Sequence, residues 1–335
     1  MDKKLRQLGF KEANFHTGEV ILNYVTGPPS KGPPIVFLHG QTETWDEYTL
    51  IMPKLCDKFT VYSITQRGHG RSTWTPGMYS FNALGRDISK FLREVVREPA
   101  IVVGNSSGGV LTTWLAANAK EYVKAIVLED PPLFRCEHPA IMGTTAYDLF
   151  LAFTRTTVPN GGGLAALFRD FLVPVVSEIE GVLTSERRGP PKWALLLIGR
   201  LIGFHQFIWP GAPIDFWFLP QVPRRRIRCM SQFDGNFSRA FVDGSMGKDF
   251  DHAEALARVE APVLFLHAKY FMHKDGKLLG ALTHDDVERV RGFIKGKWKY
   301  VDMKCGHAIA IDAPQREAEE IMAWAVEEGL LDNDK

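Results

Sequence analysis

A serine between two glycines, in the stretch Gly104-Asn-Ser-Ser-Gly108, is the residue best placed for nucleophilic chemistry in this chain. The apolar run 100–103 before it predicts a buried strand, and 110–117 after it has the pattern of a helix. The two glycines allow a turn too tight for side chains on either flank. Such a turn lifts the Ser106 hydroxyl clear of the sheet, and the helix N-terminus favours negative charge developing there. The stretch therefore predicts covalent catalysis by Ser106.

A serine needs a base to accept its proton, and histidine is the commonest base near neutral pH. His307 follows the last strand-like run, 298–302, within Cys305-Gly306-His307. We expect His307 to take the Ser106 proton and return it to the leaving group. The other histidines of the C-terminal half lack this position and are expected in packing or at the surface: His252, His267, His273 and His284.

Short apolar runs bounded by turn residues recur along the chain and alternate with helical patterns. Strands that alternate with helices imply a mostly parallel sheet that helices cover on both faces. The predicted strands are 20–25, 35–38, 59–64, 100–103, 124–128, 261–266 and 298–302. The predicted helices include one starting at Trp45, 81–96, 110–117, and 312–328 with Asp312 as its N-cap.

The chain resembles the α/β-hydrolase superfamily over nearly its full length. The motifs that carry this are Leu38-His-Gly-Gln41, Arg67-Gly-His-Gly-Arg-Ser72, Gly104–Gly108 and Gly306-His307. The stretches Leu128-Glu-Asp-Pro-Pro-Leu133 and Gly280–Asp286 resemble a bacterial subgroup of capped serine hydrolases whose triad acid follows the sixth strand. The resemblance implies an α/β-hydrolase fold with a mostly parallel central sheet, an inserted helical cap, and ester hydrolysis without a cofactor or metal.

The triad acid has several candidates. In most α/β-hydrolases it follows the seventh strand, but Lys269-Tyr270-Phe271 carries no carboxylate there. Asp130, after the sixth strand and ahead of two prolines, is our preferred acid, and Glu129 is the alternative. Asp275, Asp285 and Asp286 are the remaining candidates, the last two at a predicted helix start. A loop ion pair between Asp130 and Arg135 is the structural alternative.

Two backbone N–H groups would form the oxyanion hole in this fold, those of Gln41 and Ser107. Donors aimed at a developing oxyanion are worth about 3 kcal/mol each. His39 is expected to hold the loop backbone by hydrogen bonds, and Arg67 to tie loops together.

Residues 134–250 break the alternation and predict a cap between core segments 1–133 and 251–335. The segment is rich in aromatic residues, leucine and proline, and we expect most of its apolar side chains in the cap interior. The run 193–209 has binding to a membrane interface as its alternative, but Arg200 and His205 interrupt it and no polybasic face accompanies it, so we expect it in the cap interior too. The substrate should then be a bulky apolar ester. One arginine of the cap run could bind a substrate carboxylate, as in a phthalate monoalkyl ester: Arg224, Arg225, Arg226 or Arg228.

The composition is that of an ordinary globular protein, with 45% hydrophobic and 24% charged residues and a net charge of +1 over 335 residues. This charge gives no argument for nucleic acid or an anionic membrane as partner. Four scattered cysteines without a C-x-x-C pair suit a reducing compartment. The N-terminus lacks a signal-like apolar region and no apolar run reaches 18 residues, so we expect a cytoplasmic protein.

Other readings stay open. A lactonase, an amidase or a C–C bond hydrolase would use the same three residues. A ligand receptor on the same fold would keep them without turnover. The serine argues against haloalkane dehalogenases and epoxide hydrolases, which use an aspartate nucleophile. The sequence does not predict the oligomeric state.

Overall fold

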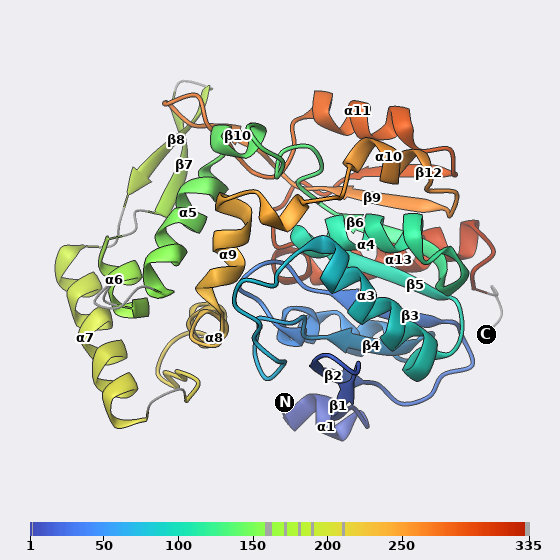
Figure 1. The fold of residues 1–335 in the computed structure, drawn as a ribbon, viewed down its shortest axis with the longest axis horizontal. Helices are drawn as coiled ribbons and strands as arrows, with labels where there is room; N and C mark the ends of the chain where they lie inside the picture. The colour runs from blue at the N-terminus through green and yellow to red at the C-terminus, as the bar shows by residue number, and fades with distance from the viewer. Residues whose placement is uncertain are drawn as a thin grey trace.

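A mixed eight-stranded sheet is the framework of the computed structural model, which describes residues 1, 3–157, 163–170, 173–179, 182–188, 191–209 and 212–331 (Figure 1). Its strand order is β1-β2-β4-β3-β5-β6-β9-β12. Strand β2 is antiparallel to β1 and β4, and the other pairs are parallel. The bounds are β1 (Lys11–His16), β2 (Ile21–Thr26), β3 (Pro34–Leu38), β4 (Thr60–Ile64), β5 (Ala100–Asn105), β6 (Val123–Glu129), β9 (Val263–His267) and β12 (Trp298–Asp302).

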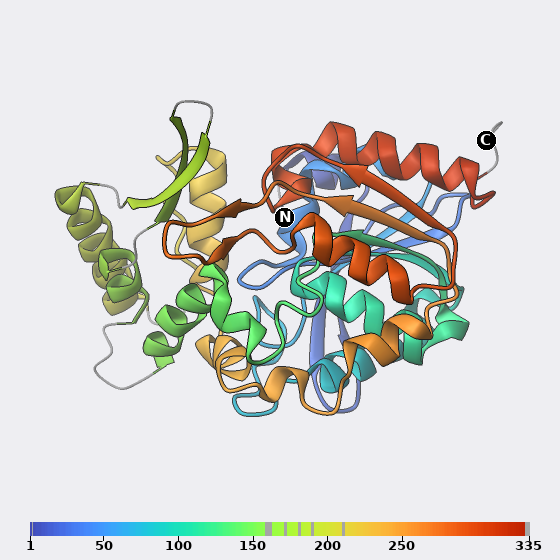
Figure 2. The ribbon, with the colours of Figure 1, turned by 90° about the horizontal axis from the view of Figure 1, so that it is seen from above.

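Helices cover both faces of this sheet, as Figure 2 shows from above. Alternate residues of a strand point to opposite faces. Accordingly Val36 packs in one core with α3 (Phe81–Phe91), α4 (Ser107–Asn118), α10 (His252–Ala257) and α11 (His284–Phe293). Its neighbour Phe37 packs in a second core with α2 (Met52–Leu55), α12 (Ile309–Asp312) and α13 (Pro314–Glu327). The predicted α/β architecture is confirmed.

The predicted elements agree with the observed ones to within a few residues, with differences at Asp312, at Trp45 and near the N-terminus. The helix expected over 312–328 begins at Pro314 after Ala313, so Asp312 is not its N-cap but the last residue of α12. The helix starting at Trp45 is a 3₁₀ helix, Trp45–Leu50. The edge strand β1 and the short helix α1 (Lys3–Gln7) were not predicted, because their mostly exposed residues carry little apolar periodicity.

Most of the segment between β6 and α10 lies beside one end of the sheet (Figure 1). It contains α5 (Thr145–Thr154), α6 (Gly163–Asp170), α7 (Lys192–Ile208), α8 (Gln221–Met230) and α9 (Gly235–Val242). It also contains an antiparallel pair, β7 (Val173–Ile179) and β8 (Val182–Arg188), where the sequence predicted only helices. Residues 158–162, 171–172, 180–181, 189–190 and 210–211 of the predicted cap lie outside the described residues.

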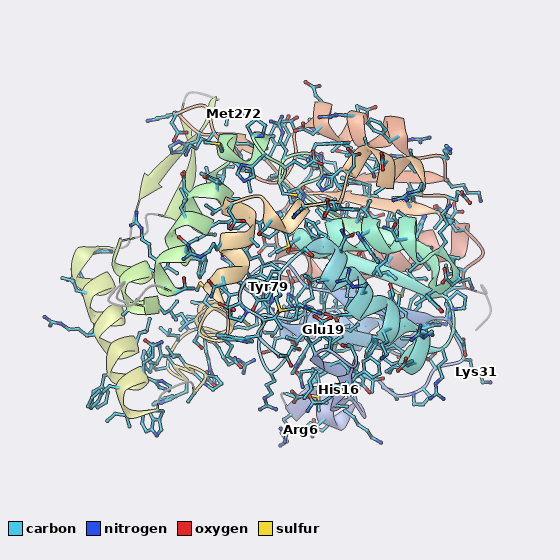
Figure 3. All side chains as sticks on the ribbon, in the orientation of Figure 1. Arg6, His16, Glu19, Lys31, Tyr79 and Met272 are labelled. Carbon is cyan, nitrogen blue, oxygen red and sulfur yellow. The ribbon has the colours of Figure 1, made fainter. Side chains whose placement is uncertain are left out.

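A small hairpin of the core reaches toward this segment. It consists of β10 (Phe271–Met272) and β11 (Leu278–Leu279), and β10 contacts β8. Met272 lies at the edge of the molecule on this hairpin (Figure 3). Among the described residues, no helix is both long and apolar enough to cross a membrane.

The segment between β6 and α10 is joined to the rest of the chain at the Arg67–Ser72 loop. The Gly70 N–H donates to the Gln232 carbonyl at 2.7 Å, and the Asp234 N–H donates to the Gly68 carbonyl at 2.9 Å. The Tyr79 hydroxyl, near the middle of Figure 3, donates to the Asp234 carboxylate at 2.6 Å. These bonds fix the start of α9 to the core.

Arg67 ties loops together, as predicted. Its buried guanidinium binds Asp87 through two nitrogens, at 2.5 and 2.8 Å, and Glu19 at 3.0 Å. Such a planar two-point contact is available to arginine but not to lysine.

The apolar run 193–209 is not in the cap interior, and here the sequence prediction is wrong. Much of its apolar surface is exposed, including Trp193 (70%), Phe204 (64%) and Phe207 (81%). Ile202 alone among the described side chains of α7 is fully buried. The periodicity of an apolar helix does not reveal whether a second layer covers it, and no described element covers this face.

Candidate active site

Ser106 has the strained backbone that the glycine-flanked turn requires. It stands between β5 and α4 with φ 53° and ψ −122°, in a region that L-residues rarely adopt. The flanking glycines are needed for close packing. A side chain at Gly104 would collide with the Gly108 carbonyl, and one at Gly108 with the Leu38 carbonyl. The positive φ is thus that of Ser106 itself, and the two glycines let α4 approach the strand ends.

His307 and Asp130 meet at the same edge of the sheet. The imidazole Nδ1 lies 2.6 Å from Asp130 Oδ2. Asp130 directly follows β6, with φ 46°, and its N–H donates to the Leu266 carbonyl of β9 at 2.9 Å. The Asp130 side chain is 1% exposed and that of His307 is 41% exposed. The carboxylate is therefore sealed while the imidazole stays open on its other side.

The pKa of His307 is raised above its usual value of 6.5. Burial favours the neutral ring and works against this rise, but the hydrogen bond to Asp130 and that carboxylate's charge outweigh it, with smaller help from Glu47 and Asp312. With Nδ1–H donated to the carboxylate, Nε2 is left as the basic nitrogen.

Asn105 joins the serine turn to the histidine loop, and sequence reasoning missed it. Its side-chain amide donates to the His307 carbonyl at 2.9 Å. It occupies a variable position of the Gly-x-Ser-x-Gly motif, which does not specify its type. The only clue in the sequence is its place at the end of a strand that should face the histidine loop.

The loop after β3 lies against the serine. A Cβ on Gly40 would stand 3.2 Å from the Ser106 Cβ and 2.9 Å from the Asn105 side-chain oxygen. The next residue is Gln41, whose side-chain amide donates to Ser238 of α9 at 2.5 Å. Ser107 is the first residue of α4, where backbone N–H groups lack helical partners. Both expected oxyanion donors thus belong to segments that border Ser106.

His39 holds this loop, as predicted. Nδ1 lies 2.7 Å from the Gly40 carbonyl, and Nε2 accepts from the Gln66 N–H at 2.9 Å. Burial lowers the pKa of His39 to about 4, so its ring is neutral.

The other candidate acids have different partners. Asp286 caps α11 through Thr283 and binds Arg135 at 2.9 Å, so Arg135 is not paired with Asp130. Asp275 lies 2.7 Å from His273. Glu129, the last residue of β6, is fully buried and lies 3.3 Å from the Tyr48 hydroxyl.

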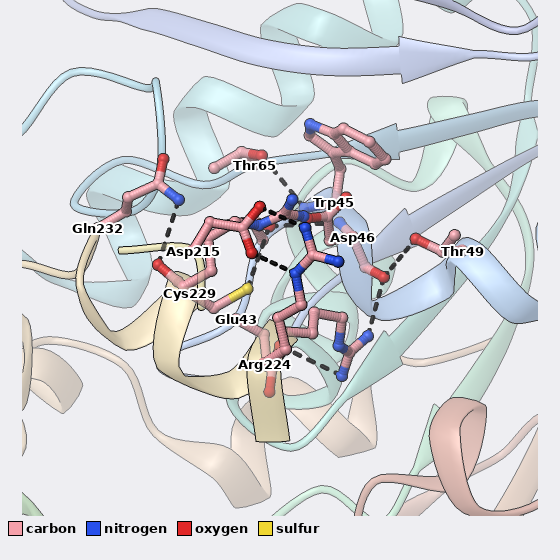
Figure 4. Close-up of polar contacts among 12 residues, drawn as sticks. Glu43, Trp45, Asp46, Thr49, Thr65, Asp215, Arg224, Cys229 and Gln232 are labelled. Atoms are coloured by element: carbon pink, nitrogen blue, oxygen red, sulfur yellow. Dashed lines mark hydrogen bonds and ion pairs between the residues drawn. The ribbon is translucent and has the colours of Figure 1, made fainter. Parts of the chain in front are cut away.

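The four cap arginines lie on α8, which faces residues 43–46 of the core (Figure 4). Arg224 binds Asp215, with Nη2 2.7 Å from Oδ2, and Arg228 is paired with Asp46. Arg225 donates to the Asp46 carbonyl at 2.9 Å, and its Nη2 lies 3.5 Å from Glu43. Arg226 is exposed. Three of the four therefore have protein partners.

Comparison with known proteins agrees with this architecture. Residues 33–158 match the family model described as the alpha/beta hydrolase fold. A hydrolase from Pseudomonas aeruginosa PA01 superposes with a TM-score of 0.62 at 19% identity, over 94% of this chain and 98% of that one. The structure of E-2-(acetamidomethylene)succinate hydrolase superposes with a TM-score of 0.59 at 19% identity, over 95% and 99%. The chain has the α/β-hydrolase fold.

A curated sequence is also similar over part of the chain. The 2-(acetamidomethylene)succinate hydrolase of Mesorhizobium japonicum is 33% identical over 113 residues, which are 34% of this chain and 40% of that protein. The chain thus matches less than half the length of this relative.

Proposed function

We propose that this protein is a serine hydrolase that cleaves a carboxylic ester. The observation that carries the proposal is the 2.6 Å contact between His307 Nδ1 and the sealed Asp130 carboxylate, at the edge where the strained Ser106 turn stands. A strained serine and an oriented imidazole are the parts that acyl transfer requires.

The proposed reaction has two halves. Ser106 Oγ attacks the ester carbonyl carbon while His307 Nε2 takes its proton, and the Gln41 and Ser107 N–H groups stabilise the oxyanion. The C–O bond to the alcohol breaks, and the alcohol leaves with the proton from His307. Water then gives its proton to His307 and attacks the acyl-enzyme, which releases the acid and restores Ser106.

A panel of p-nitrophenyl esters with acyl chains of rising length tests the proposal. Wild type should release p-nitrophenol and Ser106→Ala should not. A fluorophosphonate probe should label wild type at Ser106 only. Absence of both turnover and labelling would favour the alternative of a ligand receptor on this fold.

For the substrate we propose a bulky apolar ester with a free carboxylate. Arg225 is the arginine best suited to that carboxylate, because its guanidinium contacts residues 43 and 46 just after the Gln41 loop. The relative named as a succinate hydrolase supports an anionic substrate. A phthalate monoalkyl ester has both features. The test compares it with its diester in wild type, Arg225→Ala and the exposed control Arg226→Ala. A higher KM for the monoester in Arg225→Ala alone is expected, and equal cleavage of both esters contradicts the carboxylate site.

Amide hydrolysis is the second candidate, because that relative's name includes an acetamido group. The same residues would act, with the amine leaving in place of the alcohol. Lactone and C–C bond hydrolysis use this chemistry too. Matched ester, amide and lactone substrates separate them by kcat/KM.

A further inference from the structure

The hydroxyl of Tyr48 touches the ends of three neighbouring strands. Tyr48 belongs to the 3₁₀ helix 45–50 and is fully buried. Its Oη lies 3.1 Å from the Leu38 carbonyl at the end of β3 and accepts the Asn105 N–H at the end of β5, at 3.2 Å. It also lies 3.3 Å from Glu129 Oε2 at the end of β6.

These three strand ends lead into the three parts of the proposed site. Leu38 precedes the Gln41 loop, Asn105 precedes Ser106, and Glu129 precedes Asp130. One oxygen atom therefore contacts the strand ends that precede the Gln41 loop, Ser106 and Asp130.

The number of hydrogens at this contact favours a protonated Glu129. A phenol has one hydrogen, yet both the Leu38 carbonyl and Glu129 lie within its reach. If Tyr48 donates to Leu38, Glu129 must donate to Tyr48, which only a protonated carboxyl group can do. An ionised Glu129 would leave Leu38 or Glu129 without a donor in a site closed to water, at the cost of an unsatisfied buried group.

Glu317 of α13 is a second buried carboxyl group that acts on Glu129 through its charge. Both side chains are fully buried, and Glu129 Oε1 and both Glu317 carboxyl oxygens have no hydrogen-bond partner among the described residues. Two ionised carboxylates without donors would repel each other in this buried place, so a proton on one of them is favoured. Burial is the main cause that raises the pKa of both, and their mutual repulsion raises that of Glu129 further.

We propose that Tyr48 is a positioning residue for the reaction, and that Glu129 serves it as a neutral hydrogen-bond donor rather than as the triad acid. The inference rests on the proposed function, because its main readout is ester turnover. Tyr48 has no contact with the reacting atoms and acts through the strand ends alone.

Tyr48→Phe removes the shared oxygen and keeps the ring. We expect kcat to fall by roughly tenfold to a hundredfold with KM nearly unchanged, because small displacements of reacting groups cost about this much. Tyr24→Phe, in β2 at the other side of the sheet, is the matched control and should leave kcat unchanged. An unchanged kcat in Tyr48→Phe overturns the positioning role.

A second pair of variants tests the role of Glu129, and this test can still be made if Tyr48→Phe folds poorly. Glu129→Gln keeps a donor and an acceptor, so kcat should stay within about threefold of wild type. Glu129→Leu has neither, so its kcat should fall by about as much as that of Tyr48→Phe. An inactive Glu129→Gln overturns the neutral-donor role. The wild-type protein is assayed before any variant. If it neither hydrolyses esters nor is labelled at Ser106, the proposed function is contradicted, and not the role of Tyr48.

A different observation concerns the outer face of α7. Its exposed apolar residues recur at helical spacing and form one stripe: Trp193, Leu196, Leu197, Phe204, Phe207 and Ile208. The helix α7 packs on α6 and lies at the edge of the molecule farthest from the sheet (Figures 1 and 2). An apolar face of this kind marks a site of association.

The charges on α7 favour one partner for this stripe. The helix contains no acidic residue, and Arg200 lies midway along Lys192–Ile208, on the same face as the stripe. Two copies of α7 paired about a two-fold axis at its middle would bring Arg200 against Arg200, which is repulsive. Lipid phosphates would instead pair with Arg200, and Trp193 and Trp209 at the helix ends suit the membrane–water boundary.

We therefore infer that this stripe docks on an anionic lipid surface, with α7 lying in its plane. Flotation with vesicles of phosphatidylcholine and phosphatidylglycerol tests this. Wild type should float, and Leu197→Asp or Phe207→Asp should each bind about tenfold more weakly, because each loses an apolar side chain from the lipid. Leu8→Asp, which changes an exposed leucine far from α7, is the control and should bind vesicles as wild type does. Wild type that does not float, or a dimer in solution that Leu197→Asp abolishes, overturns the lipid assignment.

Discussion

His307 Nδ1 and Asp130 Oδ2 lie 2.6 Å apart although 177 positions separate them in the chain. Strand β9 lies between their strands in the sheet, so the histidine loop after β12 must reach over the end of β9 to the end of β6. Asn105 supports that reach by donating to the His307 backbone.

Substituting the nucleophile or the base should abolish turnover without unfolding the protein. Ser106→Ala and His307→Ala should each lower kcat for a p-nitrophenyl ester on the order of 10⁴-fold, because these residues act as a unit. Thermal unfolding should stay cooperative in both variants. A tenth of the wild-type rate in Ser106→Ala would be incompatible with a serine nucleophile.

Substitutions of Asp130 and Asp286 should have different effects on turnover and on stability. Asp130→Asn should lower kcat by about 10⁴-fold, because an amide cannot hold the imidazole in the required tautomer. Asp286→Asn should leave kcat intact and cost about 1 kcal/mol of unfolding free energy, because Asp286 caps α11. Kinetics and urea unfolding of both variants, with Asp275→Asn as a further control, measure this. Near-normal turnover by Asp130→Asn would exclude it as the acid.

The pH dependence should follow His307. Its pKa is raised above 6.5 in the folded protein, so kcat/KM should rise with pH through a midpoint above 6.5 as the neutral base forms. The same shift gives stability that is fully present below about 6.5 and is lost as pH rises through the folded pKa. Asp130→Asn should move the residual midpoint down. A midpoint at or below 6.5 in wild type would contradict the ion pair.

The close approach behind Ser106 should make Gly108 irreplaceable. Gly108→Ala would drive a methyl group into the Leu38 carbonyl, so we expect a loss of several kcal/mol of stability, and of activity with it. Gly143→Ala is the control, because nothing lies within 4 Å of its would-be Cβ. Denaturation midpoints compare the two, and equal midpoints would show that α4 can shift without cost.

Much of this protein is determined by local sequence. The turn at Ser106 follows from the order of strand, glycines and helix, because a strained serine needs small neighbours whatever the rest of the fold does. The hydrogen bonds of His39 and the loop-tying role of Arg67 also follow from their motifs. The six parallel strands follow from short apolar runs, which only a sheet covered on both faces can bury.

Tertiary structure decided what depends on distant partners. Adjacent residues of a strand end point to opposite sides, so the sequence could not choose between Glu129 and Asp130. The fold turns Glu129 toward Tyr48 and Glu317, and the left-handed backbone of Asp130 directs its carboxylate to His307. The pairing of the cap arginines and the exposure of α7 were likewise set by which elements pack against them, because periodicity reports that a face is apolar and not what covers it.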